Sequence, residues 1–415
     1  MTRRLRAASC LFGFVLGLSF LWSQSSAPKL TPAEVEENRQ TIHQLEQLVE
    51  RAADPAEVMY VLAVFHSRLG ETKEAIEWIQ KADAEHEGFD PLGDVELANI
   101  QDDPEFQRVA KAIHTRIPAV SRSTLAYQIS EKDLIPEGLA YDTATHKLYL
   151  SSLNKHKILE IEPSGRFRDF ISSGQDGIWQ TLGMKVDQKT GSLWVCSAQD
   201  SGPDVGSAGV FHYDLKSGKL IKKYLADRNE QHLFNDLVVS STGDVYLTDS
   251  TAGRVYQILH NKDALEEMSD FKRLSYPNGI ALSDDQSKLY VAHFNGGLTV
   301  LDLKSHQTKL VNRPKGGTLA GIDGLYVWRG TLVGVQNGIG APRVAQFTLN
   351  KAGDGIEAIK ILENRSRYLE IPTTGALVER DLYLIANSQL RTLHEGKIID
   401  PAKLKPVYIL KMKVQ

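Results

Sequence analysis

One position of a long internal repeat carries side chains that could bind a metal ion. Six segments share one outline, in which a residue and a glycine precede an apolar run, and a second apolar run follows a polar turn. The residues before that glycine position are, in chain order, Glu137, Leu182, Asn235, Asn278, Asp323 and Thr374. Two are carboxylates and two are carboxamides, and these four groups carry a summed charge of −2. Oxygen ligands suit a hard divalent cation such as calcium, whereas zinc would ask for His or Cys.

The repeat itself predicts the elements that must position these side chains. Its glycine column holds Gly138, Gly183, Gly279, Gly324 and Gly375, with Asp236 in the third copy, at intervals of 45, 53, 43, 45 and 51 residues. A period of this length with several short strands is typical of propeller blades, so six copies predict a six-bladed β-propeller. Equivalent positions in six blades form a ring around the central channel. Asn and Asp are also common turn residues, but turn chemistry does not favour the glutamate in this set.

These motifs resemble a known family. Pro136-Glu137-Gly138, Asn235-Asp236, Pro277-Asn278-Gly279 and Ile322-Asp323-Gly324 are similar to motifs of the gluconolactonase and senescence-marker-protein (regucalcin-like) group of six-bladed propellers, over about residues 125–410. The resemblance implies that Glu137, Asn235, Asn278 and Asp323 bind one divalent metal ion, and that Asp323 also acts as general base toward a lactone. Such an ion would polarise the carbonyl and stabilise the developing oxyanion.

Departures from the family pattern limit how far its sugar-lactone substrates, and the histidine dyad of the related paraoxonases, can be carried over to this chain. Gluconolactonase-like enzymes usually carry arginine two residues before the first metal-binding Asn, where this chain has Leu233. Paraoxonases place a histidine where this chain has Leu182. The run from Val245 to Ser250 is similar to strictosidine-synthase-like propellers, and within it Asp249 is expected to brace a hairpin rather than touch substrate.

Two alternatives to a metal-dependent hydrolase therefore stay open. One is a non-catalytic propeller that binds a ligand or a protein and whose metal is structural. The other is a metal-free, strictosidine-synthase-like enzyme, in which Glu137 and Asp323 would lie too far apart to share an ion. Fold alone does not separate these functions.

Two residues at the strand end of the fourth blade are candidate substrate contacts. His293 could carry protons at the channel mouth, and Phe294 could form an aromatic wall. The alternative for His293 is a histidine that is hydrogen-bonded between blades.

The first 118 residues precede the repeat. Residues 1–27 resemble a secretory signal peptide, because Arg3, Arg4 and Arg6 precede an apolar run of about 12 residues, too short for a stable membrane span. Residues 31–118 are predicted to be helical, opening with an N-cap at Thr31 and breaking at Gly70, and they resemble one tetratricopeptide repeat. This module could bind a protein partner or serve as a spacer or lid. Residues 123–415 are assigned to the propeller.

The composition excludes some classes of binding partner and of metal site. The net charge of −4 gives no basic excess of the kind that nucleic-acid binding needs. Cys10 and Cys196 supply neither a zinc site nor a disulfide framework, and Cys196 is expected to be a buried apolar residue. The sequence as a whole predicts an exported, periplasmic or extracellular, calcium-dependent hydrolase of the lactonase or esterase type that acts on a small molecule.

Overall fold

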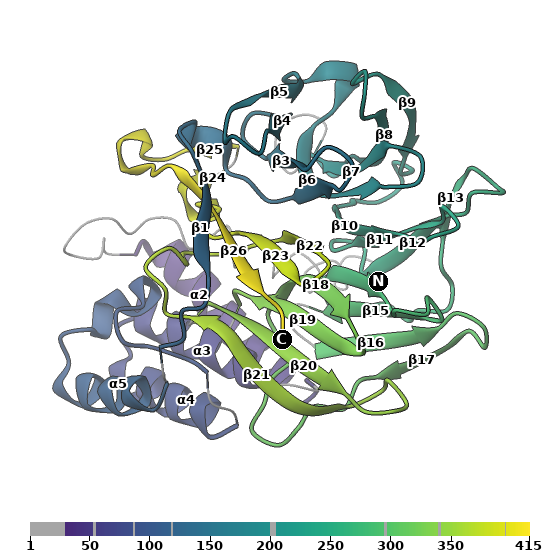
Figure 1. Ribbon diagram of the computed structural model, residues 1–415. Coiled ribbons are helices and arrows are strands. Elements are labelled where there is room, and N and C mark those ends of the chain that lie inside the picture. Colours follow the sequence, from purple (N-terminus) through teal and green to yellow (C-terminus); the bar gives the residue numbers. More distant parts are fainter. Residues whose placement is uncertain are drawn as a thin grey trace.

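The computed structural model of the chain describes residues 30–52, 55–85, 88–117, 119–199, 205–293, 297–338, 342–394 and 396–415. The signal peptide predicted over residues 1–27 and the candidate substrate contact Phe294 lie outside these described residues. The remaining chain forms a ring of six four-stranded sheets with a group of helices beside it (Figure 1). The prediction of a six-bladed β-propeller preceded by a helical module is confirmed.

Each blade is an antiparallel sheet whose first strand is the innermost one. Blades one to five follow the chain in order. Their strands are β2 (Leu139–Asp142), β3 (Lys147–Ser152), β4 (Lys157–Ile161) and β5 (Phe167–Ile171); β6 (Gln180–Asp187), β7 (Ser192–Ala198), β8 (Ala208–Asp214) and β9 (Leu220–Leu225); β10 (Phe234–Val239), β11 (Val245–Asp249), β12 (Arg254–Ile258) and β13 (Leu265–Glu267); β14 (Pro277–Leu282), β15 (Lys288–His293), β16 (Gly297–Asp302) and β17 (Gln307–Leu310); β18 (Ile322–Trp328), β19 (Thr331–Gln336), β20 (Arg343–Leu349) and β21 (Ile356–Asn364).

The sixth blade joins the two ends of the propeller. It contains β22 (Gly375–Val378), β23 (Asp381–Ile385) and β26 (Val407–Lys413), and its outer strand is β1 (Thr124–Ile129), which lies beside β26 in Figure 1. A small hairpin, β24 (Leu393–His394) and β25 (Lys397–Ile398), is inserted between β23 and β26. Because an early strand and a late strand pair, the ring closes without leaving long inner edges exposed.

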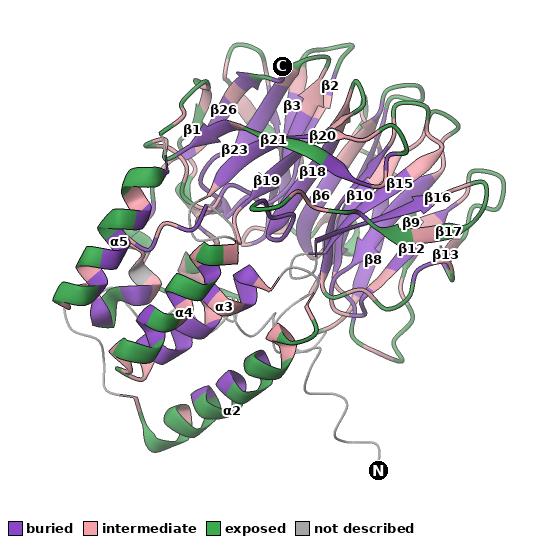
Figure 2. Ribbon diagram, turned by 90° about the horizontal axis from the view of Figure 1, so that it is seen from below, coloured by how far each residue is buried: buried purple, intermediate pink, exposed green. Residues whose placement is uncertain are grey.

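Apolar side chains between neighbouring blades form the propeller core. Leu332 and Phe347 of the fifth blade, for example, share a buried cluster with Tyr290 and Leu298 of the fourth. The strands of the propeller are accordingly buried along most of their length, while the connecting turns are exposed (Figure 2).

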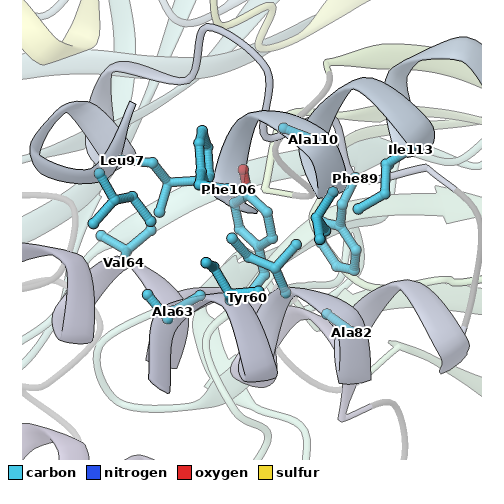
Figure 3. Close-up of a cluster of buried hydrophobic side chains, with 14 of the residues drawn as sticks. Tyr60, Ala63, Val64, Ala82, Phe89, Leu97, Phe106, Ala110 and Ile113 are labelled. Carbon is cyan, nitrogen blue, oxygen red and sulfur yellow. The ribbon is translucent and has the colours of Figure 1, made fainter. Parts of the chain in front are cut away.

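The helical module has its own core and clear helix boundaries. Its helices are α2 (Pro32–Val49), α3 (Ala56–Arg68), α4 (Thr72–Glu85) and α5 (Pro104–Arg116), with a short 3₁₀ helix, η1 (Val95–Ile100). Thr31 and Glu34 form a capping box at the start of α2, and Gly70 adopts a φ of 74° just after α3, as expected from the sequence. Figure 3 shows Tyr60, Val64, Phe89, Phe106 and other side chains packed between these helices. No helix of the described residues is long and apolar enough to cross a membrane.

Candidate metal centre

The six repeat positions lie at the inner end of each blade, and four of them fall within β-bulges. In β6, β10, β14 and β18 the pairing with the next strand shifts register across two residues, and in each case these two are the ring residue and its successor. They are Leu182-Gly183, Asn235-Asp236, Asn278-Gly279 and Asp323-Gly324. A bulge releases the two residues from the ladder and turns a side chain away from its regular direction. The sequence repeat thus encodes a repeated local distortion at the site.

Contacts between successive blades hold these positions in one closed ring. A Cβ atom at Gly138 would overlap the carbonyl oxygen of Leu182. Equivalent crowding occurs between Gly183 and the Asn235 carbonyl, between Gly279 and the backbone around Asp323, and between Gly324 and the backbone at Thr373 and Thr374. The last step returns to the first blade, because Thr374 Oγ1 donates to the Glu137 carbonyl at 2.6 Å.

The third blade departs from the glycine column without opening the ring. Asp236 stands in place of glycine there, and Thr248 Oγ1 bridges the carbonyls of Asp236 and Asn278 at 3.4 and 2.8 Å. The glycine column is therefore explained by close approach of neighbouring inner strands, and Thr248 supplies the link where the glycine is missing.

Three of the four predicted ligand residues have a buried oxygen that lacks a hydrogen-bond partner. These atoms are Glu137 Oε2, Asn235 Oδ1 and Asn278 Oδ1, and each parent residue is buried. The Asn235 amide nitrogen donates to Ser250 Oγ at 2.9 Å, which leaves its oxygen as the free end of the side chain. Buried polar atoms are almost always paired, so three such oxygens in one ring fit the coordination demands of a hard cation.

The two carboxylates of the ring interact with each other. Burial raises the pKa of Glu137 well above its usual range, and repulsion from Asp323 and Asp236 raises it further. Burial also raises the pKa of Asp323 to about 7, although hydrogen bonds from Asn337 and Asn278 lower it and only Asp236 adds repulsion. The pair is thus held in an environment that disfavours its own negative charge unless a cation is present.

A partly buried ion pair lies next to the ring residues. Asp236 is fully buried, and Lys185 Nζ donates to its Oδ1 at 3.4 Å. Lys185 Nζ also lies 5.6 Å from the centre of the Tyr326 ring. Because Lys185 and Tyr326 belong to the second and fifth blades, which face each other, these side chains reach across the channel.

The structure also shows the surroundings of the other residues that the sequence singled out. His293 at the end of β15 is buried, and its Nε2 has no hydrogen-bond partner among the described residues. Burial lowers its pKa to about 4, so the imidazole is neutral at pH 7. Asp249 accepts hydrogen bonds from the backbone of Leu233 and Ala252 and from His232, so it braces the hairpin as expected. Cys196 is buried and unpaired, also as expected.

Asn337 is a site residue that sequence reasoning missed. It follows β19, and its amide nitrogen donates to Asp323 Oδ2 at 2.6 Å and to the Pro372 carbonyl at 2.8 Å. It therefore ties the predicted base to the loop of the next blade. Asn337 lies outside the glycine column, and the only signal for it is the glycine-rich stretch in which it occurs.

The candidate centre depends on carboxamides. Within the described ranges, no group of three or more His, Cys, Asp or Glu side chains is placed to hold a metal ion. Asn235 and Asn278 would therefore have to supply two of the oxygens, with Glu137 and Asp323 supplying the charge. The assignment of these four residues as ligands stays a prediction.

Comparison with known proteins relates this region to a lactonase-containing family. The family model described as "SMP-30/Gluconolactonase/LRE-like region" matches residues 135–327, which include Glu137, Asn235, Asn278 and Asp323. Lactonase drp35 of Staphylococcus epidermidis is 28% identical over 188 residues, which cover 42% of this chain and 55% of that protein. Lactonase drp35 of Staphylococcus aureus is 26% identical over 193 residues, 43% of this chain and 56% of that one. The chain thus spans about half the length of these curated relatives.

Solved structures share the fold at lower identity. A calcium-binding protein, regucalcin, from Agrobacterium tumefaciens is 16% identical with a TM-score of 0.50, and the match covers 72% of this chain and 98% of that one. The PQQ-bound aldose sugar dehydrogenase of Streptomyces coelicolor is 15% identical with the same TM-score, and the match covers 72% and 99%. At these identities the likeness extends to the fold alone.

Proposed function

Since residues 135–327 form an SMP-30/gluconolactonase/LRE-like region, we propose that this protein is a divalent-metal-dependent hydrolase of the lactonase type. Glu137, Asn235, Asn278 and Asp323 would hold one calcium ion, and Asp323 would be the general base. The substrate would be a small lactone or a related ester. The lactonase relatives support the reaction class, since drp35 is itself named a lactonase.

The observation that carries this proposal is the set of orphaned buried oxygens. Glu137 Oε2, Asn235 Oδ1 and Asn278 Oδ1 come from three different blades and have no partner among the described residues. Asp323, on the fifth blade, raises the pKa of Glu137 by repulsion. Repulsion between two buried carboxylates is relieved by a bound cation, which favours the metal-binding function over the metal-free alternative.

The chain's own groups suit hydrolysis of a cyclic ester. When bound, a divalent cation supplies polarisation of the ester carbonyl. Asp323 would accept a proton from the attacking water as general base. Asn337 and Asn278 hold the Asp323 carboxylate by hydrogen bonds, which fixes its orientation. Addition of the water oxygen to the carbonyl, cleavage of the ring C–O bond and return of the proton to the leaving alkoxide give a hydroxy acid.

Export is a separate part of the proposal. Arg3, Arg4, Arg6 and the apolar run that follows favour cleavage within about the first 27 residues and release into the periplasm or beyond the cell. Cell fractionation with mass analysis of the mature N-terminus tests it. An intact N-terminus in the cytoplasmic fraction would overturn it.

Titration calorimetry and kinetics together test the proposed function. We expect the chelator-treated protein to bind one calcium ion per chain, and we expect Asp323→Asn to lower kcat/KM for lactone hydrolysis by about 10²–10⁴-fold. The surface variant Glu162→Gln is the matched control, because it removes a carboxylate that pairs only with exposed groups. A wild-type protein that binds calcium but hydrolyses no lactone or ester would instead be a binding propeller with a structural metal. Absence of metal binding would contradict both the metal-dependent hydrolase and the binding propeller with a structural metal.

A further inference from the structure

The helical module docks on the same face of the propeller as the candidate metal centre. Ring residues lie where the innermost strands begin, so the loops that precede those strands open on that face. The second strand of each blade runs antiparallel to the first and ends on this face as well. The loops at residues 311–321, 365–374 and 386–392 therefore all border the ring's side of the propeller. Figure 2 shows the helices gathered along one side of the propeller.

Three arginines, one from each of these loops, contact carboxylates of the module. Arg313 Nη2 lies 3.4 Å from a Glu85 oxygen, Arg365 Nε lies 3.8 Å from Asp90, and Arg391 Nε lies 3.7 Å from Glu96. In every pair the propeller supplies the cation and the module supplies the anion. This charge complementarity gives the module one preferred docking position.

One end of the docking surface is tightly fixed and has the properties of a hinge. The fully buried Glu363 at the end of β21 accepts hydrogen bonds from the backbone nitrogens of Arg122 and Ser123 at 2.7 and 3.0 Å. Val120 and Asn364 exchange two backbone hydrogen bonds, and Arg365 Nη1 donates to the Ile117 carbonyl at 2.6 Å. Residues 117 and 120–123, between α5 and β1, are thus bound to the fifth blade and to the loop that follows it.

The remaining ion pairs between the module and the propeller are weaker contacts and have the properties of a latch. The pairs Arg313–Glu85 and Arg391–Glu96 are longer than the hinge hydrogen bonds. Each pair has one partner that is more exposed, Glu85 at 41% and Arg391 at 45%, and one that is less exposed, Arg313 at 25% and Glu96 at 13%. Solvent-exposed ion pairs at such distances contribute little free energy each. The module can therefore separate from the face at the latch while the hinge stays bound.

The inserted hairpin extends this cover across the ring. Arg391 lies at its start, and Leu390, Leu393 and Ile398 belong to one apolar cluster with Leu182 and Leu233 of the second and third blades. The insertion thus reaches from the sixth blade to residues beside the ring, while its arginine touches the module. The Arg391–Glu96 pair thus joins the insertion to the module on the ring's side of the propeller.

We infer that the helical module is a hinged lid over the candidate site, latched by Arg313 and Arg391, and that it selects substrates by size. The selection of substrate rests on the proposed lactonase function, whereas the control of access to the ring does not. A closed latch admits small molecules and excludes bulky ones until the module swings away.

Cysteine labelling at the ring tests access without any catalysis. The Leu182→Cys change is made in a Cys10→Ser protein, so that the remaining native cysteine is Cys196, which is buried and does not compete. We expect Arg313→Glu to speed labelling by a bulky fluorescein maleimide about five-fold relative to N-ethylmaleimide, the effect of losing one exposed ion pair of about 1 kcal/mol. The charge swap Glu85→Arg with Arg313→Glu should restore the original ratio. Arg391→Glu is tested without a swap, because Glu96 also pairs with Arg68.

Two controls separate the latch from general effects of charge. Arg166→Glu removes an arginine from the turn between β4 and β5, which opens on the opposite face, and should leave the ratio unchanged. A cysteine at the exposed Ser164 of that turn should react at rates independent of the latch. An unchanged labelling ratio at Leu182→Cys in both latch variants would overturn the lid.

Kinetics then distinguish failure of the lid from failure of the proposed function. The ratio of kcat/KM for a naphthyl-substituted γ-lactone over γ-butyrolactone should rise about five-fold in Arg313→Glu and return in the charge swap. A rise in labelling with an unchanged kinetic ratio would overturn size selection. Absence of hydrolysis in every variant would overturn the lactonase function, while the labelling result would still decide whether the lid controls access.

Discussion

Burial is the dominant influence on the charged residues of the candidate site. Asp323 and Glu137 lose solvent on entering the channel, and this raises the pKa of both carboxyl groups more than any single neighbour does. The carboxamides of Asn235 and Asn278 add unpaired oxygens without adding charge. A divalent cation would satisfy the oxygens and offset the repulsion at once, which is why affinity for metal and protonation must compete at this site.

The raised pKa of Asp323 predicts how the stability of the folded protein depends on pH. Its folded-state pKa of about 7 exceeds the ordinary value of 3.8, so the folded protein binds the proton more tightly than the unfolded chain. The resulting stabilisation is complete below about pH 4 and is lost as the pH rises through about 7. We expect the melting temperature of chelator-treated protein to fall over this window by more than that of Asp323→Asn. Calcium should stabilise the wild type most at the upper end, where the carboxylates are ionised.

His293 must be accounted for in this measurement. Burial lowers its pKa to about 4, so the folded protein binds this proton less tightly than the unfolded chain does. The contribution of His293 to stability is therefore lost as the pH drops below about 6.5, opposite to the contribution of Asp323. The difference between the wild type and Asp323→Asn removes this background. Equal pH dependence of the two proteins would show that Asp323 is not protonated in the folded state.

Asn337 should be a positioning residue for Asp323. Its amide donates to Asp323 Oδ2 and lowers the pKa of that carboxyl group. We expect Asn337→Ala to lower kcat/KM about tenfold, the effect of losing a hydrogen bond to a charged group, and to move the acid limb of the pH profile upward. Asn154→Ala is the matched control, because that loop asparagine donates only to the Asp133 carbonyl. If Asn337→Ala lowers kcat/KM by the same factor at every pH, the role of Asn337 is purely structural.

At the scale of the elements, the repeated strands could be predicted from the sequence, but the β-bulges that distort them could not. Alternating apolar runs and the glycine column suffice to predict the two inner strands of each blade, since both follow from local patterns. The bulges at Asn235, Asn278 and Asp323 were not predictable, because a bulge depends on pairing with the next strand. The short outer strands such as β13 (Leu265–Glu267) also lack a strong local pattern.

The glycine column should be sensitive to the addition of a single methyl group. A Cβ at Gly279 would overlap the Asp323 carbonyl and lie 2.8 Å from the Leu325 nitrogen, and both are backbone atoms that cannot rotate away. We expect Gly279→Ala to destabilise the protein by about 1–3 kcal/mol, as overpacking does, and to weaken calcium binding by displacing Asp323. Chemical denaturation and calorimetry measure the two effects.

Gly355→Ala provides the comparison. Its new methyl group would meet the side-chain nitrogen of Asn350 rather than backbone, so the neighbour can move. We expect a smaller loss of stability and unchanged calcium binding. A Gly279→Ala protein with full stability and metal affinity would contradict the close-approach explanation of the column.

At the scale of the whole molecule, the features that the sequence does not reveal are those that join distant segments. The pairing of β1 with β26 connects residues almost three hundred positions apart, and no local pattern marks Thr124–Ile129 as part of the last blade. The same holds for the arginines that meet the helical module, since Arg313, Arg365 and Arg391 have nothing unusual around them in the chain. The sequence predicts two units, whereas their mutual contacts emerge only from the three-dimensional arrangement.

Glu363 should control how strongly the two units behave as one. Its buried carboxylate accepts hydrogen bonds from Arg122, Ser123 and Ser121, all in the chain that joins the module to the propeller. Glu363→Ala would leave these donors unsatisfied, at a cost of about 1–3 kcal/mol for each one that stays buried. In scanning calorimetry we expect the variant to melt at lower temperature and in two resolved transitions, because the module is released from the propeller before the blades unfold. Glu357→Ala, an exposed glutamate on the same strand, should melt like the wild type. A single, unshifted transition in Glu363→Ala would mean that the module is held elsewhere, by the latch or by packing, and that the hinge contributes nothing to the coupling.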